Sequence, residues 1–258
     1  MYLTVQALVL RVTNYNDNDA LLTLLTKSHG KITVKARGLR RKNSPLTAPC
    51  QLLAYAEFTL FEYKNQYTIN EAHSIQLFQG LRNDLQRFTL GTYFVQVADL
   101  ISLEDAPNPD LLSLVLNCLY MLTQKEEKEP KIKAVFELRA ACLAGYTPDL
   151  EGCCICADPN PVLFHTKEGH MVCRNCNDGG DYGIRMPVSN GVLAAMRYIS
   201  SCHSKKLFSF SINEESYEVL SGATEAYLTA QLEKSFSTLD FYKRLIYGSI
   251  DLLGEENV

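Results

Sequence analysis

Residues 20–37 read ALLTLLTKSHGKITVKAR and contain two short apolar runs on either side of a turn. The runs, Ala20–Thr26 and Lys31–Arg37, are rich in aliphatic and β-branched residues, as strands are. Ser28, His29 and Gly30 between them have the small, turn-forming character of a hairpin connection. This stretch therefore predicts two adjacent β-strands.

Three further runs of the same kind flank this pair, namely Thr4–Arg11, Leu52–Phe61 and Gln66–Ala72. An Asn-rich turn at 14–18 and a loop at 38–49 that contains Gly and Pro separate the runs. Five closely spaced strands with one long loop predict a barrel of the OB type over residues 1–79. The strand face and loops of such barrels often bind single-stranded nucleic acid.

This first part carries a net positive charge, although the formal net charge of the chain is −4. Residues 1–80 hold nine Lys and Arg against five Asp and Glu, and no acidic residue occurs from Ala20 to Ala56. Seven of the nine form the predicted DNA-binding site: Lys27, Lys31, Lys35, Arg37, Arg40, Arg41 and Lys42. Such a cluster can neutralise several phosphates. A solvated loop beside a strand is an equally good interpretation of the basic run alone.

After Gly80 the pattern becomes helical. We expect helices at 83–103, 110–125, 130–145, 191–201, 214–231 and 237–247. Pro130 suits the first turn of its helix, and Gly145 suits the position just past the end. No apolar run approaches eighteen residues, which excludes a membrane-spanning helix. The predicted fold class is α+β, with an all-helical domain over 80–258 that an insert at 149–187 interrupts.

The insert carries the most specific motif of the chain, C-x2-C-x16-C-x2-C. Its cysteines are Cys153, Cys156, Cys173 and Cys176. Two pairs at this separation predict a zinc-ribbon-like insert with one structural Zn²⁺. Four thiolates argue against catalytic zinc, which keeps one position open for water. A metal-free hairpin or redox-active cysteines are the alternatives.

The other candidate groups of the sequence favour ordinary structural roles. We expect the neighbouring Cys154 to stay outside the site, and His165 and His170 to lie on the hairpin surface. Asp17-Asn18-Asp19 could hold a cation, but turn chemistry is the better interpretation. No nucleotide-binding, metalloprotease or serine-hydrolase motif occurs, so we expect a protein that is not an enzyme. Nine cysteines without an export signal indicate a reducing, cytoplasmic location.

In their order, these parts resemble the bacterial RecO family of DNA repair and recombination mediators. The resembling segments are Ala7–Arg11 with Tyr15 and Asp19; 29–32, 36–38 and 40–44; Phe136–Leu138; Gly145–Pro148; and the two cysteine pairs. Some family members lack the zinc cysteines, whereas this chain has all four. The resemblance implies a nucleoid-associated protein that binds single- and double-stranded DNA and anneals complementary strands. With RecR, it would help RecA replace single-stranded-DNA-binding protein.

The acidic helical domain would repel DNA, so we expect it to bind protein partners, and the resemblance implies the tail of single-stranded-DNA-binding protein as a ligand. We expect the acidic tail of single-stranded-DNA-binding protein to seek a basic spot beside the apolar helix at 132–143, with candidates Lys131, Lys133, Arg139 and Tyr146. Possible base-stacking residues are Tyr15, Tyr55, Phe61, Tyr63 and Tyr67, although the barrel core is the better expectation for each. A zinc-ribbon and OB factor that binds RNA or ribosomes, or a thiol oxidoreductase using Cys153 and Cys156, are the rival functions.

Overall fold

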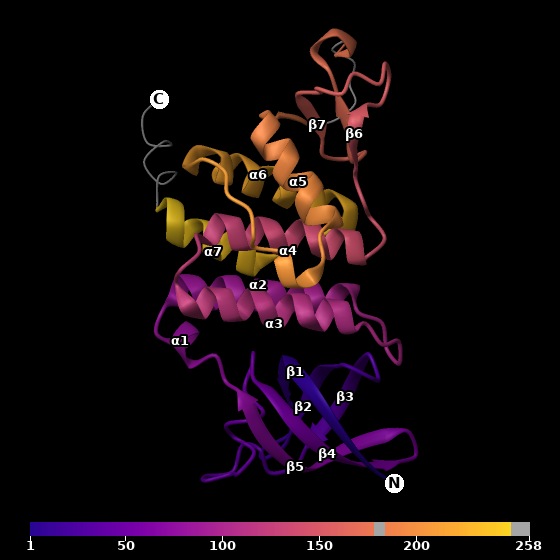
Figure 1. The fold of residues 1–258 in the computed structure, drawn as a ribbon. Coiled ribbons are helices and arrows are strands. Elements are labelled where there is room, and N and C mark those ends of the chain that lie inside the picture. The colour runs from indigo at the N-terminus through magenta and orange to yellow at the C-terminus, as the bar shows by residue number, and fades with distance from the viewer. Residues whose placement is uncertain (178–183, 249–258) are drawn as a thin grey trace, which may run out of the picture. The chain divides into compact units, whose positions relative to one another are not determined.

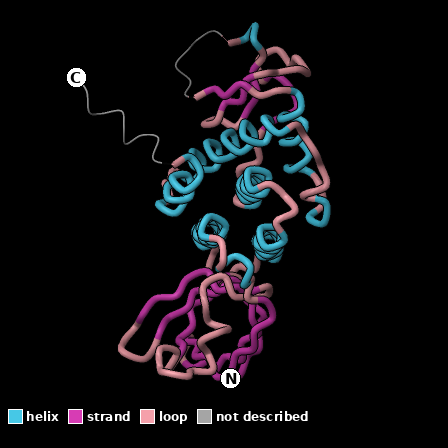
Figure 2. The backbone as a smooth tube through the Cα atoms, turned by 90° about the vertical axis from the view of Figure 1, so that its left-hand side faces the viewer, coloured by secondary structure: helices cyan, strands magenta, loops and turns pink. Residues whose placement is uncertain are grey.

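The N-terminal part of the computed structural model, which describes residues 1–177 and 184–248, is a closed five-stranded barrel. Its strands are β1 (Tyr2–Asn14), β2 (Ala20–Thr26), β3 (Lys31–Ala36), β4 (Tyr55–Tyr63) and β5 (Gln66–Gln76). They pair in the order β1-β2-β3-β5-β4, and β4 closes the barrel against β1 (Figures 1 and 2). Only the β3–β5 pairing is parallel among these neighbours. The predicted OB-type barrel is confirmed.

The barrel core follows from strand alternation. Ala56, Phe58 and Leu60 of β4 point inward and are fully buried, and the residues between them face outward. Strand β4 begins at Tyr55 and not at the expected Leu52, because Leu53 has a φ of 68° that a strand cannot accommodate. The connection from residue 37 to 54 consists mostly of turns, and its Leu46 and Cys50 complete the barrel core.

Four helices pack into one compact unit with the barrel. They are α1 (Gln79–Arg82), α2 (Leu85–Ile101), α3 (Pro109–Gln124) and α7 (Ser237–Tyr247). Figure 1 shows α2 and α3 side by side next to the barrel. Asp84 caps α2 by accepting the N–H of Arg87, and the rings of Tyr93 and Phe236 meet edge to face at 5.3 Å. Strands give way to helices between Gln76 and Gln79, but this compact unit extends to residue 124 and resumes at Phe236.

The second compact unit, residues 125–235, contains α4 (Glu129–Leu143), α5 (Asn190–Ser201) and α6 (Glu214–Leu232). Pro130 lies in the first turn of α4, and Gly145 follows its end with a φ of 93°, as predicted. Between α4 and α5 lies a small sheet of order β6-β8-β7-β9. Its strands are β6 (Asp149–Cys153), β7 (Leu163–His165), β8 (His170–Val172) and β9 (Arg185–Pro187). This sheet is the predicted insert, except that residues 178–183 lie outside the described part.

Among the described residues, no helix is long and apolar enough to span a membrane.

Candidate metal centre and nucleic-acid interface

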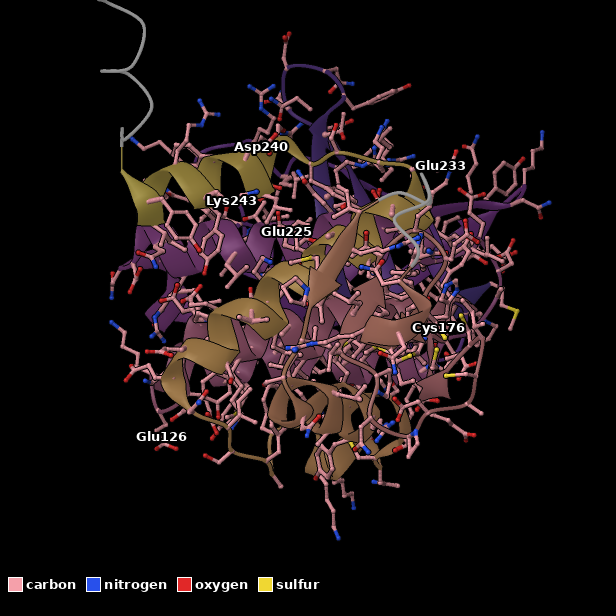
Figure 3. The ribbon with its side chains drawn as sticks, turned by 90° about the horizontal axis from the view of Figure 1, so that it is seen from above. Glu126, Cys176, Glu225, Glu233, Asp240 and Lys243 are labelled. Carbon is pink, nitrogen blue, oxygen red and sulfur yellow. The ribbon has the colours of Figure 1, made fainter. Side chains whose placement is uncertain are left out.

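The four predicted cysteines converge in the insert. Cys153 ends β6 and Cys156 follows in the adjoining turn, whereas Cys173 follows β8 and Cys176 ends the short 3-10 helix η1 (Arg174–Cys176). Their sulfur atoms all lie within 4.8 Å of one another. The Sγ atoms of Cys156 and Cys173 are 3.7 Å apart, far longer than a disulfide bond of about 2.05 Å. Figure 3 shows yellow sulfur atoms gathered beside the labelled Cys176.

Hydrogen bonds within the cluster shift the pKa values of Cys153 and Cys176 in opposite directions. Burial raises the pKa of Cys153, but the backbone N–H groups of Cys156, Cys173 and Ile155 outweigh this effect and lower the pKa to about 6. Side-chain hydrogen bonds with Cys156 and Cys173 raise the pKa of Cys176. Cys153 therefore ionises readily while Cys176 holds its proton, and thiolates this close together would repel one another. A divalent cation would relieve that repulsion, so the donor set fits a single metal ion.

Not all residues next to the cysteine cluster lie where the sequence predicts. Cys154 is exposed and does not join the cluster, as expected. His165 does not lie on the hairpin surface as predicted, because it is only 1% exposed. It belongs to β7, an inner strand of the sheet, and it pairs with His170 of β8 on one side and with Arg185 of β9 on the other. Its Nδ1 accepts the N–H of Glu168. Short strands beside the cysteine cluster give no sequence signal for which strand lies inside the sheet.

The seven predicted DNA-binding residues do not form one surface. Lys27 lies in the turn before β3, whereas Arg37, Arg40, Arg41 and Lys42 follow its other end. The two lysines within β3 are partly buried and paired. Lys31 Nζ lies 3.2 Å from Asp99 Oδ1 and donates to the Asp99 carbonyl, and Lys35 Nζ lies 3.2 Å from Asp19 Oδ2.

The four exposed residues Arg37, Arg40, Arg41 and Lys42 are called the basic loop here. It lies against the β1–β2 turn, residues 15–19. The backbone N–H of Arg40 donates to the carbonyl of Asn18, and its guanidinium donates to the carbonyl of Asn16 at 2.9 Å. The basic loop and the β1–β2 turn thus form one cationic corner of the barrel.

The barrel-core expectation fails for the exposed aromatic candidates but holds in part for Tyr67, which packs against the barrel core. Tyr15, Phe61 and Tyr63 are exposed and Tyr55 and Tyr67 are partly buried. Tyr15, at 57% exposure, belongs to the cationic corner, and the ammonium of Lys35 lies 4.8 Å from its ring centre. Phe61 points outward because Phe58 and Leu60 of the same strand fill the core. Its ring packs on that of Tyr2, a residue that the sequence analysis did not single out. Strand alternation counted from Leu60 could have placed Phe61.

Two of the four residues expected at the partner site are not on the surface. Lys131 and Lys133 are 4% and 3% exposed, because both side chains point into the helical packing of this unit. Lys131 Nζ contacts both carboxylate oxygens of Glu127 at 2.8 Å, and Lys133 contacts buried Glu137 at 3.0 Å. The expectation that these two charges are available to an acidic peptide is therefore wrong.

The other two residues of that prediction differ from the lysines. The guanidinium of Arg139 is partly buried and donates to the carbonyls of Ile199 and Ser200, near the end of α5. Tyr146 is 41% exposed and its carbonyl accepts the hydroxyl of Tyr227. A role of Arg139 and Tyr146 in partner binding stays a prediction.

Comparisons with known proteins extend over both compact units. A family model described as Recombination protein O N terminal matches residues 1–78, and one described as Recombination protein O C terminal matches residues 82–240. The DNA repair protein RecO of Acetivibrio thermocellus is 34% identical over 248 residues, which are 95% of this chain and 97% of that protein. The proteins of the same name from Clostridium novyi and Desulfitobacterium hafniense are 31% and 30% identical over 93% of this chain and 93% and 89% of their own lengths.

Proposed function

This chain belongs to the RecO family of DNA repair proteins, and from this premise we propose that it is a non-enzymatic recombination mediator of the bacterial cytoplasm and nucleoid. It binds single- and double-stranded DNA and anneals complementary strands. With RecR, it promotes loading of RecA on DNA that single-stranded-DNA-binding protein covers. The barrel is the DNA-binding part of this proposal.

The observation that carries the proposal is the cationic corner. Four exposed basic side chains lie together on an otherwise acidic protein, and the exposed ring of Tyr15 lies beside them. Arg and Lys contact phosphates whatever the base sequence, and an aromatic ring can stack on an unpaired base. This combination supports binding of nucleic acid without sequence preference.

The experiment compares R40A/R41A/K42A with wild type in binding single-stranded DNA over a range of salt concentrations. Four phosphate contacts predict a slope of log K against log salt of about −3, from about 0.7 per contact. The triple variant should flatten this slope by about 2 and weaken all sequences alike. A matched control, K167A/K205A/K206A, removes three exposed charges of the second unit and should keep the slope. An unchanged slope in R40A/R41A/K42A would refute this site.

The same measurements with RNA test the rival RNA- or ribosome-binding function. Phosphate contacts are common to both nucleic acids, so binding alone does not separate the two functions. Annealing does: the proposal expects complementary DNA strands to anneal faster in the presence of the protein than RNA strands of equal sequence. Faster annealing of RNA would favour the rival function.

We further propose that the cysteine cluster holds one structural Zn²⁺. Four thiolates about 2.3 Å from a tetrahedral zinc would lie about 3.8 Å from one another, close to the 3.7 Å between Cys156 and Cys173. The metal would neutralise the thiolates and hold the two cysteine pairs together. Metal analysis of the purified protein should give about one equivalent of zinc. Absence of zinc together with reactive Cys153 and Cys156 would favour the oxidoreductase instead.

The proposed partners are RecR, RecA and the tail of single-stranded-DNA-binding protein. Arg139 and Tyr146 are the predicted tail contacts that have some exposure. Pulldown from a bacterial lysate, with and without nuclease, tests whether RecR and single-stranded-DNA-binding protein bind the protein itself. Recovery only without nuclease would show that DNA bridges them. Y146A should weaken binding of the isolated tail peptide if the location is right.

A further inference from the structure

Asp19 lies at the junction of the β1–β2 turn and the basic loop. Its Oδ1 accepts the backbone N–H of Gly38 at 2.8 Å, and its Oδ2 lies 3.2 Å from Lys35 Nζ. The backbone N–H of Asp19 donates to the side-chain oxygen of Asn16 at 3.0 Å. The hydrogen bond from Gly38 is the largest cause that lowers the pKa of Asp19, and Lys35 and Asn16 add to it. The carboxylate therefore remains ionised at neutral pH.

Gly38 is the residue from which the basic loop turns. Its φ of 67° is a conformation that glycine adopts without strain, and its carbonyl accepts the N–H of Arg41. The hydrogen bond from the Gly38 N–H to the Asp19 carboxylate therefore fixes the backbone that carries Arg37, Arg40 and Arg41. The bonds from Arg40 to Asn16 and Asn18 attach the same backbone to the turn a second time.

Judged by its charge alone, Asp19 should weaken DNA binding. It is a carboxylate within the cationic corner, it neutralises Lys35, and it would repel a phosphate backbone. If only charge mattered, replacing Asp19 by a neutral residue would strengthen DNA binding. Its position predicts the reverse, because a loop that moves freely must be ordered again when several of its cations contact phosphates at once.

We propose that Asp19 is a positioning residue for nucleic-acid binding, which holds the basic loop through Gly38 so that its cations meet the phosphates as a preformed array. This inference rests on the proposed function, because it names a further residue of the same site. It gives the acidic side chain a favourable effect on the binding of a polyanion.

Three variants of Asp19 separate position from charge. D19A removes both. D19N loses the charge but keeps an oxygen that accepts the Gly38 N–H, and D19E keeps the charge on a longer side chain that does not fit the same hydrogen bond. The control is D17A: Asp17 is exposed in the same turn and makes no hydrogen bond or ion pair within the described residues. Single-stranded DNA affinity and its salt slope are measured for each.

Positioning predicts that D19A and D19E bind at least about fivefold more weakly at 0.1 M salt, the loss expected for one phosphate contact, with a shallower slope. D19N should bind at least as well as wild type, and D17A equally or up to about twofold more tightly. A charge effect alone predicts that D19A and D17A both gain affinity and that D19E is unchanged. That result would overturn the inference.

A defect in folding is separated by repeating D19A in the R40A/R41A/K42A background. If Asp19 acts through the basic loop, D19A should cause a clearly smaller loss there, because only Arg37 of the basic loop remains, whereas an equal loss in both backgrounds would overturn the inference. D19E provides the same test should D19A fail to fold. The proposed function fails separately, if R40A/R41A/K42A binds DNA like wild type. The inference alone fails if that triple variant is weak and both D19A and D19E bind normally.

Discussion

Replacing Lys133 by Met should destabilise the second unit more than any surface charge substitution. Lys133 Nζ lies 3.0 Å from Glu137 and 2.8 Å from Glu225, so one ammonium serves two carboxylates between α4 and α6. Ser221 accepts hydrogen bonds from the same ammonium, and Thr224 donates one to Glu137. Figure 3 labels Glu225 on its helix. Removing one partner of a buried ion pair costs about 3–5 kcal/mol, because the remaining charge is left without compensation.

The loss should depend on pH. Burial raises the pKa of Glu137 to about 7, although Lys133 opposes the rise. The folded pKa lies above the unfolded value of 4.5, so the folded protein binds this proton more tightly. The resulting stabilisation is full below about pH 4.5 and is lost as the pH rises through 7. In K133M a protonated Glu137 relieves the repulsion from Glu225, so the variant should lose less stability at pH 5.5 than at pH 8.

Urea denaturation followed by circular dichroism at both pH values measures this effect. At pH 8 a loss of about 3–5 kcal/mol corresponds to a fall in Tm of roughly 6–20 °C for a protein of this size. The matched control is K131M. Lys131 is equally buried, but its partner Glu127 is partly exposed and can turn to water, so the loss should be smaller. A loss in K133M below about 1 kcal/mol, or the same loss at both pH values, would refute the reasoning.

Three further outcomes are expected. Chelation of the proposed zinc, or the substitution Cys153→Ser, should remove about one equivalent of zinc and loosen the insert without changing the melting of the barrel. Release of less than half an equivalent would contradict the zinc proposal. Y15A should weaken the binding of single-stranded DNA by about 1–3 kcal/mol and leave duplex binding nearly unchanged, because only unpaired bases can stack on the ring. The control Y15F keeps the ring and should bind normally. G30A should destabilise the barrel unit by more than about 2 kcal/mol, because its Cβ would lie 2.4 Å from the Ala106 carbonyl oxygen. G145A should cost only about 1 kcal/mol, because no atom lies within 4 Å of the added Cβ. Equal losses of stability in thermal melts would show that the contact with Ala106 does not determine the effect.

The sequence contained most of the fold because local patterns determined it. The five apolar runs correspond to β1–β5, Pro130 and Gly145 lie at the two ends of α4, and the cysteine spacing brought four sulfurs together. The site was predicted less well, since the pairing of a charge depends on residues far away in the chain. No acidic residue lies within Ala20–Ala56, but folding places Asp99 against Lys31 and leaves four basic side chains exposed beyond β3.

The attachment of the insert explains why loss of metal should remain local. Phe164 of β7 meets the ring of Tyr227 on α6 at 5.4 Å. On α5, the guanidinium of Arg197 donates to the carbonyls of Leu150 and Glu151, both at 2.7 Å. These contacts involve none of the cysteines. Around the cysteine cluster, by contrast, the buried residues are Cys153, Cys173 and Val172, with Leu163 and Cys176 partly buried against them. A bound metal would therefore supply stability where packing is thinnest, and its removal should release the cysteine turns while β6 stays attached to α5.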